Sequence, residues 1–278
     1  MKINFSMWRT AIWQLVKMDD KKEWDALDVV SKWLIATRSA VTLVTVYSCI
    51  IAGLLAWRDG FFSWGPFLVL TISLFIFGAL VLLFYTWPLK YWALGELAIF
   101  LIWGPIMIAG VYFVLALGAG QSMPVNLWNV ALAGIPFGLS VASINVGKHI
   151  DKRDDDIKKG VGTFPVRAGE KFARFVNQFA VVMTYAVIVY LVIVHYFTPI
   201  MLIVFFAGKR ALLVLGVLNK PRPSEPPKEW PGWPTWFSGF AFYHNRMFGG
   251  LLILGLILDS ALRVIPFTAP LILKFWPM

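Results

Sequence analysis

Apolar stretches long enough to cross a membrane recur along the whole chain, and few folds can accommodate them. A helix needs about 20 consecutive apolar residues to span the hydrocarbon core of a bilayer. In lipid, the backbone N–H and C=O groups must bond within the spanning segment, so such stretches are helices. Charged residues make up only 14% of the sequence, whereas soluble domains carry about 25%. The sequence therefore predicts an all-α integral membrane protein.

Seven spans follow from the apolar pattern. They cover residues 32–57, 66–87, 91–117, 127–146, 175–196, 198–218 and 236–262. The chain then divides into an amphipathic interfacial segment (1–31), a transmembrane helical domain (32–262) and a short hydrophobic tail (263–278). Because the tail is shorter than a span, we expect it to be interfacial or re-entrant.

The basic residues gather in the connections on one side of the predicted bundle. The formal net charge of +10 would also suit a nucleic-acid partner, but the positive-inside rule explains this distribution without one. We therefore expect the N-terminus and the basic connection 148–174 to face the cytoplasm at an inner or plasma membrane. Lys209 and Arg210 are exceptions that lie deep in a span. They either face a polar cavity or snorkel to the cytoplasmic side.

The most polar stretch, residues 147–170, is called the aspartate loop below. Four aspartates and five lysine or arginine residues lie within residues 148–159. If the stretch is helical to Asp156, Asp151 shares a face with Asp154 and Asp155. Crowded carboxylates favour a hard divalent cation such as Mg²⁺, and neighbouring basic residues suit phosphate oxygens. The alternative is a solvated loop held by salt bridges.

The aspartate loop resembles the second aspartate motif of the UbiA-type membrane prenyltransferases, closest to the menaquinone (dihydroxynaphthoate) branch. The positions that fall in register are Gly160, Thr163, Val166, Arg167 and Gly169. Asp156 takes the second aspartate position of the motif, whereas Lys152 stands at the first. Other stretches are also similar to the family: residues 35–38, 85–96, 103–105, 110–112, 233–236 and 245–250. Together they extend the resemblance over most of residues 32–262.

The resemblance implies a shortened UbiA prenyltransferase-like bundle. Family members carry a first aspartate motif after their second span, but here Glu96 is the only acid between Asp59 and Asp151. About two helices and the loop between them are missing relative to the family pattern. The faces that those helices would cover are expected to contact lipid or another membrane subunit.

The resemblance also implies site residues and a cofactor. Metal ligands for Mg²⁺ would be Asp151, Asp155 and Asp156, taken as exposed loop carboxylates. Diphosphate contacts would be Lys148, Lys152, Lys159 and Arg38, although all four also serve as topology signals. Glu96 is expected to face the interior or to cap a helix. His149 is expected to be a loop or cap residue. No catalytic residue can be assigned.

Two functions remain open. In the family, an allylic diphosphate loses pyrophosphate and its carbon alkylates a quinone-type aromatic acceptor, a step of quinone biosynthesis. This chain would keep that ancestral activity in impaired form, because one aspartate cluster is missing. The alternative is a non-catalytic subunit of a membrane complex that binds lipid or quinone. The expected partners are membrane lipid and an isoprenoid or quinone-type ligand, and nucleic acid is not expected.

Overall fold

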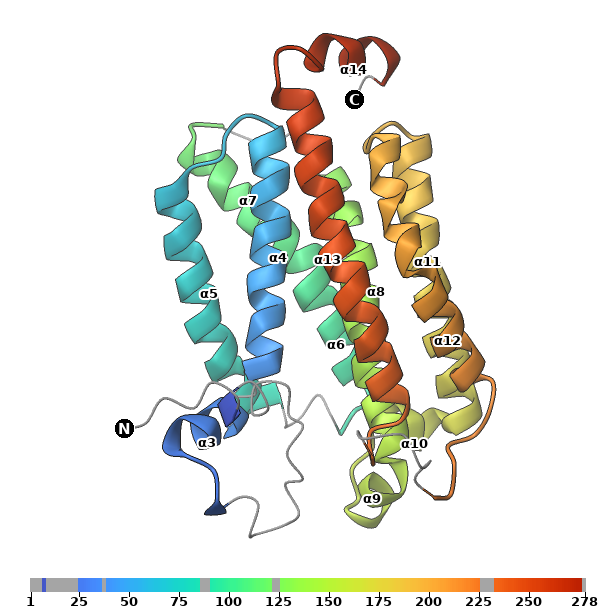
Figure 1. The fold of residues 1–278 in the computed structure, drawn as a ribbon. Coiled ribbons are helices and arrows are strands. Elements are labelled where there is room, and N and C mark those ends of the chain that lie inside the picture. The colour runs from blue at the N-terminus through green and yellow to red at the C-terminus, as the bar shows by residue number, and fades with distance from the viewer. Residues whose placement is uncertain are drawn as a thin grey trace.

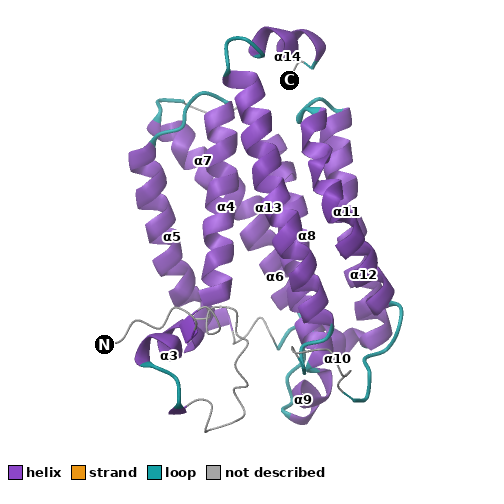
Figure 2. Cartoon of the chain, viewed as in Figure 1, coloured by secondary structure: helices purple, strands orange, loops and turns teal. Residues whose placement is uncertain are grey.

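The structure is a computed structural model that describes residues 7–8, 25–36, 39–85, 91–121, 126–225 and 233–276. Every regular element in these ranges is helical (Figure 2), which confirms the predicted fold class. Long helices run side by side along one axis and form a bundle (Figure 1). The chain is thus an integral membrane protein of the predicted all-α type.

Each predicted span overlaps one helix, or two or three helices in direct succession. The elements are α4 (Ser39–Arg58), α5 (Trp64–Tyr85), α6 (Gly95–Leu101) with η1 (Ile102–Ile106) and α7 (Met107–Gly118), α8 (Leu127–Asp151), α11 (Glu170–Ile193), η2 (Pro199–Ala207) with α12 (Gly208–Leu218), and α13 (Phe237–Val264). Five spans in the described residues are long and apolar enough to cross a membrane, and α4 and α5 contribute the shorter apolar stretches Leu43–Arg58 and Trp64–Ile76.

Short helices lie at the two ends of the bundle. α3 (Val29–Ala36) precedes α4 as a separate element, and the Asp28 carboxylate accepts the Ser31 N–H at 2.6 Å as its N-terminal cap. The predicted first span, residues 32–57, therefore overlaps both α3 and α4. α9 (Arg153–Lys158) and α10 (Phe164–Ala168) lie at the same end as α3, the aspartate-loop end. α14 (Ala269–Phe275) lies across the opposite end, called the α14 end (Figure 1).

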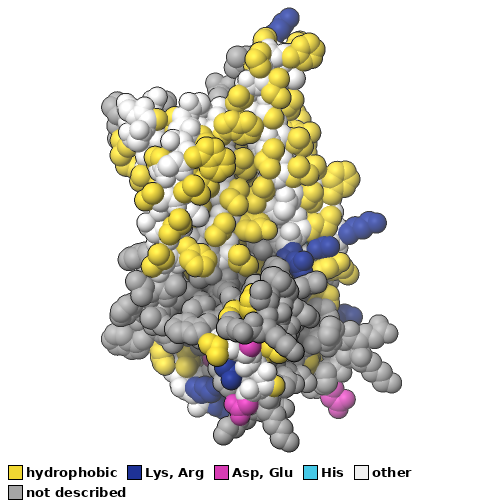
Figure 3. All heavy atoms as spheres, turned by 60° about the vertical axis from the view of Figure 1, so that its left-hand side comes forward, with side chains coloured by type: hydrophobic (Ala, Val, Ile, Leu, Met, Phe, Trp, Pro, Cys, Tyr) yellow, Lys and Arg dark blue, Asp and Glu magenta, His cyan; other side chains and the backbone are white. Residues whose placement is uncertain are grey.

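α8 is the central helix, packed against α6, η1, α7, α11 and α13. α5 lies at the edge, where it packs on α4 and α7 (Figure 1). The main apolar core lies between these helices and contains the fully buried rings of Tyr112, Phe137 and Phe248. A smaller core near the aspartate loop contains Ile150 and Phe237. In Figure 3, hydrophobic side chains gather on the outer face between the α14 end and the residues drawn in grey, as expected of a surface in contact with lipid.

A contact between glycines brings the span α6–η1–α7 against α8. Gly104 has non-helical φ/ψ (−98°, −112°) and is followed by Pro105, so the helix bends there. A Cβ on Gly104 would lie 2.9 Å from the Cα of Gly138, and one on Gly138 would lie 2.6 Å from the carbonyl oxygen of Phe100. Gly134 meets the same backbone at 3.0 Å. Small residues of this kind let two membrane helices approach closely.

Candidate functional site

The aspartate loop folds into two short helices rather than one continuous helix. α8 ends at Asp151, Lys152 leaves helical geometry (φ −106°, ψ 11°), and α9 begins at Arg153. Gly160 (φ 65°) and Gly169 (φ 86°) then take backbone conformations that favour glycine, before α10 and before α11 respectively. The break at Lys152 interrupts the helical register on which the predicted common face of Asp151, Asp154 and Asp155 depended.

Asp151 is buried, with 6% of its surface exposed, and it caps the first turn of α13. Its carboxylate accepts the backbone N–H groups of Trp236 at 2.9 Å and of Phe237 and Ser238 at 3.0 Å each, together with the Ser238 hydroxyl at 2.7 Å. The first N–H groups of a helix have no partner inside the helix, and they favour a negative charge. The Arg222 guanidinium donates to the Asp151 carbonyl oxygen at 2.7 Å. Asp151 thus joins the end of α8 to the start of α13.

The other aspartates of the loop differ in exposure. Asp156 is buried at 5%, and the Thr163 hydroxyl donates to its carboxylate at 3.3 Å. Asp155 is exposed, and the Asp154 side chain is 87% exposed with Arg153 3.8 Å away. The expectation that Asp151, Asp155 and Asp156 are all exposed is therefore wrong for the first and the last. Among the described residues, no three His, Cys, Asp or Glu side chains are grouped to hold a metal ion. Metal binding by these aspartates stays a prediction.

The loop is braced against the rest of the bundle end. Arg153 donates to the carbonyl oxygen of Pro165 at 3.1 Å, which ties α9 to α10. Arg167 donates to the carbonyl oxygen of Tyr91 at 2.7 Å, which ties α10 to the segment that leads into α6. A Cβ on Gly162 would lie 2.7 Å from the same carbonyl, so only glycine fits there. The aspartate loop is therefore held in place over the segment before α6.

Three of the four predicted diphosphate contacts, Lys148, Lys152 and Lys159, belong to this braced loop. Lys152 and Lys159 are exposed, and Lys148 is partly buried near the end of α8. Arg38 lies outside the described residues. A cleft of about 270 Å³ opens beside the loop, lined by Asp151, Arg153, Asp154, Glu170, Arg222 and Trp233 among others. Two of the lining residues contact each other, since the Arg222 guanidinium lies 4.3 Å over the Trp233 ring.

Glu96 and His149 form a buried pair at the same end. The His149 Nδ1 and the Glu96 Oε1 lie 2.5 Å apart, with both side chains almost fully buried. Glu96 is in the first turn of α6 and His149 is in the last turn of α8. The first of the two alternatives for Glu96, an interior position, is the one observed, whereas the sequence indicated no partner for His149 because 53 positions separate the two residues. A second such pair, Tyr185 and His244, lies 2.8 Å apart inside the bundle.

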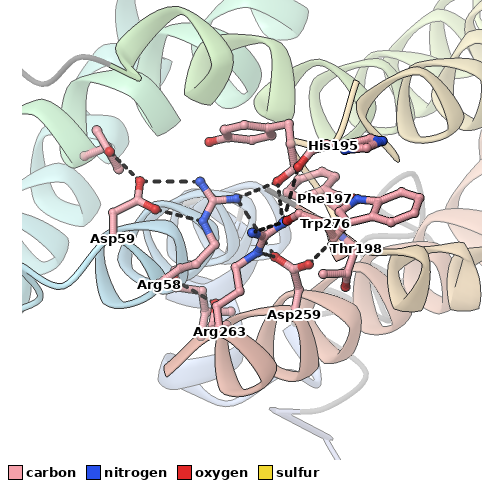
Figure 4. A network of polar contacts seen from close by, with 12 residues as sticks. Arg58, Asp59, His195, Phe197, Thr198, Asp259, Arg263 and Trp276 are labelled. Carbon is pink, nitrogen blue, oxygen red and sulfur yellow. Dashed lines mark hydrogen bonds and ion pairs between the residues drawn. The ribbon is translucent and has the colours of Figure 1, made fainter. Parts of the chain in front are cut away.

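The α14 end holds a separate network of buried charges (Figure 4). Arg58 pairs with Asp59 at 2.9 Å and lies 3.9 Å from Asp259, and Arg263 lies 3.6 Å from the same Asp259 oxygen. Asp59 also accepts the Tyr112 hydroxyl at 2.6 Å, and the other Asp259 oxygen accepts the Thr198 N–H at 2.7 Å. Every charge in this network has a partner. It ties α4, α7, η2 and α13 together and stands at the opposite end from the aspartate loop.

Comparisons with known proteins agree with this architecture. A protein-family model described as the UbiA prenyltransferase family matches residues 33–245. Among curated proteins, a 2-carboxy-1,4-naphthoquinone phytyltransferase from Synechocystis sp. (strain ATCC 27184 / PCC 6803 / Kazusa) is 30% identical over 125 residues. That match covers 43% of this chain and 38% of the relative, well under two thirds of its length. No solved structure matches.

Proposed function

This chain belongs to the UbiA prenyltransferase family, and from that premise we propose that it binds a prenyl diphosphate at the aspartate loop. The family's reaction, transfer of the isoprenoid chain to a quinone-type aromatic acceptor, is the activity that this binding would serve. A naphthoate-type acceptor is favoured, since the curated relative is named as a naphthoquinone phytyltransferase.

The braced aspartate loop is the observation that carries the proposal. The Asp151 cap and the Arg167 contact to Tyr91 fix the loop at the end of the bundle. Lys152 and Lys159 remain exposed beside it, where their ammonium groups can bind an anion. The apolar helices of the bundle would accept the isoprenoid chain while the diphosphate stays at the polar end.

Members of the family use Mg²⁺, but the described residues fit such an ion poorly. The carboxylate of Asp151 already accepts four hydrogen bonds, and that of Asp156 accepts the Thr163 hydroxyl. Asp155 is the exposed carboxylate among the three predicted ligands. We therefore expect Mg²⁺ to be held weakly, with Asp155 as its main protein ligand and Lys152 and Lys159 as direct contacts to the diphosphate.

Catalysis by the isolated chain should be impaired. Cleaving the C–O bond of a prenyl diphosphate requires that the charge developing on the leaving group be neutralised. The sequence supplies one aspartate cluster, and Glu96, the acid between Asp59 and Asp151, is paired with His149 inside the bundle. Lysines can bind the anion but do not replace a second metal site. An acidic cluster from a neighbouring chain would restore the activity.

Binding and turnover of the purified full chain test this proposal. We expect weak binding of geranylgeranyl diphosphate that Mg²⁺ strengthens, and alkyl transfer to dihydroxynaphthoate near background. Asp155→Asn should remove the effect of Mg²⁺ on binding, whereas Asp25→Asn, an exposed residue before α3, should leave it intact. Turnover of about 1 per second or faster would show that catalysis is not impaired. Absence of prenyl diphosphate binding would refute the proposal itself.

The second function is a non-catalytic subunit that binds lipid or quinone. It is favoured because Asp151 and Glu96 are each already bonded inside the protein, Asp151 to the start of α13 and Glu96 to His149. Organic extracts of the purified protein distinguish the two functions. A stoichiometric quinone together with no measurable affinity for prenyl diphosphate would support the subunit. Prenyl diphosphate binding that depends on Asp155 would support the first proposal.

A further inference from the structure

Lys209 lies near the middle of an apolar span with its side chain exposed. The span runs from Pro199 to Leu218 through η2 and α12, and Lys209 is the second residue of α12. The stretch of α12 from Lys209 to Leu218 is about 13 Å long at 1.5 Å per residue.

The side chain of Lys209 is too short to bring its ammonium group to the polar zone at either end of the span. The zone at the aspartate-loop end begins where Arg174 donates to the Leu218 carbonyl oxygen at 2.9 Å and Gln178 contacts Asn219 at 2.7 Å. A lysine side chain is shorter than the 13 Å to that level. In addition, Cα–Cβ bonds of a helix tilt toward its N-terminus, which in α12 points away from that zone. The path toward Pro199 is longer, because the 3₁₀ helix η2 rises about 2.0 Å per residue.

The neighbouring Arg210, at the same depth, has both a hydrogen bond and a cation–π contact within the bundle. Its guanidinium donates to the Tyr243 carbonyl oxygen at 2.8 Å and lies 3.8 Å over the Tyr243 ring, which joins α12 to α13. Lys209 has no hydrogen bond or ion pair with the described residues. The sequence contains no Asp or Glu in residues 171–224 or 230–258. α12, and α13 before Asp259, therefore carry no carboxylate that could neutralise Lys209. The one acid of α11 is Glu170 at its first position, and it is paired with Arg174 at 3.2 Å.

We propose that the face of α12 around Lys209 is a docking surface for a transmembrane helix of another protein, one that carries an aspartate or glutamate at mid-membrane depth. Charge complementarity selects this occupant. A second copy of this chain would bring the same cation to a symmetric contact. A lipid headgroup lies at the membrane surface, about 13 Å of helix away. Phe206 and Leu212, both more than two-thirds exposed, stand three residues to either side of Lys209 and provide apolar contact.

Such a pair would set both the depth and the rotation of the partner helix. Polar groups in the hydrocarbon core have no water to bond, so an ammonium and a carboxylate that meet there satisfy each other. The surrounding apolar side chains pack against the partner without specifying its register. Lys209 therefore supplies specificity, while Phe206 and Leu212 supply contact area.

A model helix in vesicles tests the proposal. The full chain, labelled with an acceptor dye, is reconstituted in phosphatidylcholine vesicles with a donor-labelled helix of about 20 leucine and alanine residues. One helix carries a central Glu and the other a central Gln. Energy transfer should show about tenfold stronger association of the Glu helix. Lys209→Met should abolish this preference, and Lys220→Met, a matched change beyond the end of α12, should retain it.

Four outcomes would overturn the proposal. The first is equal association of the Glu and Gln helices, and the second is a Glu preference that survives Lys209→Met. The third is loss of the preference when phosphatidylglycerol is added, which would assign the surface to a lipid. The fourth is self-association of the chain that requires Lys209, which would assign the surface to a second copy. Unchanged thermal unfolding of Lys209→Met would show that the variant is folded, as expected for an exposed side chain.

Discussion

Replacing Asp151 by alanine should destabilise the bundle, although the residue lies in the most polar stretch of the sequence. The substitution removes the acceptor of three backbone N–H groups and one hydroxyl at distances of 2.7 to 3.0 Å. All four donors belong to the first turn of α13 or to the residue before it. The same substitution at the exposed Asp155 removes none of the side-chain hydrogen bonds found among the described residues.

The size of the effect follows from this geometry. A hydrogen bond to a charged group contributes about 1.5–3 kcal/mol, but bonds that share one carboxylate do not add. A helix cap alone is worth about 1 kcal/mol, and a buried donor left without its acceptor costs about 1–3 kcal/mol. We expect Asp151→Ala to lower the free energy of unfolding by about 3 kcal/mol. Asp151→Asn should cost about 1–2 kcal/mol, because the amide keeps one acceptor oxygen.

Thermal unfolding in mild detergent, followed by tryptophan fluorescence, measures the difference. A loss of 3 kcal/mol corresponds to a decrease of about 6–12 °C in Tm for a chain of this size. Asp155→Ala serves as the matched control and should leave Tm unchanged. Equal Tm values for the Asp151 and Asp155 variants, without added Mg²⁺, would refute the assignment of Asp151 as the cap of α13.

Three further predictions concern other parts of the bundle. Arg58→Met leaves two buried carboxylates without their shared guanidinium and should destabilise the protein by about 3 kcal/mol in the same unfolding assay. Arg58→Lys should recover only part of the loss, because lysine keeps the charge but lacks the planar fork of arginine. Full stability of the Met variant would contradict the network. Reporter fusions after Gly160 and after Arg263 should report the cytoplasm and the opposite side respectively. The same signal at both positions would exclude an odd number of membrane crossings between these two residues. Glu96→Leu leaves the buried His149 without its partner and should cost about 2 kcal/mol of stability, whereas Glu96→Gln should cost less than about 1 kcal/mol; equal losses would show that the hydrogen bond does not matter.

The length of the apolar stretches made the spans readable from the sequence, because a bilayer imposes both helix type and minimum length. The turn at Lys152 was not readable in the same way. Residues 148–158 contain neither glycine nor proline, so nothing in the local sequence marks a break, and the common face of the aspartates was considered on the condition that the stretch is helical. The physical reason for the turn lies elsewhere in the chain, since the donors that Asp151 satisfies are 85 to 87 positions away.

The buried pair of Glu96 and His149 was hidden for a related reason. Spacing rules detect partners that share one helix, whereas these two residues meet because α6 packs against α8. The sequence indicated that Glu96 faces the interior or caps its helix, and in the interior it needs a partner because an unpaired charge there is costly. The identity of that partner depends on helix packing, which the local sequence does not specify.

The close approach of α6–η1 to α8 determines how the chain tolerates mutation. A methyl group on Gly138 would meet backbone atoms on the facing span, so two whole helices would have to separate to make room. At an exposed position of α5 such as Val69, by contrast, the added group only displaces lipid. In a saturation mutagenesis library, Gly104, Gly134 and Gly138 should therefore be as intolerant as residues that bind a ligand. Mutational intolerance in this protein would report the distance between backbones as much as it reports chemistry.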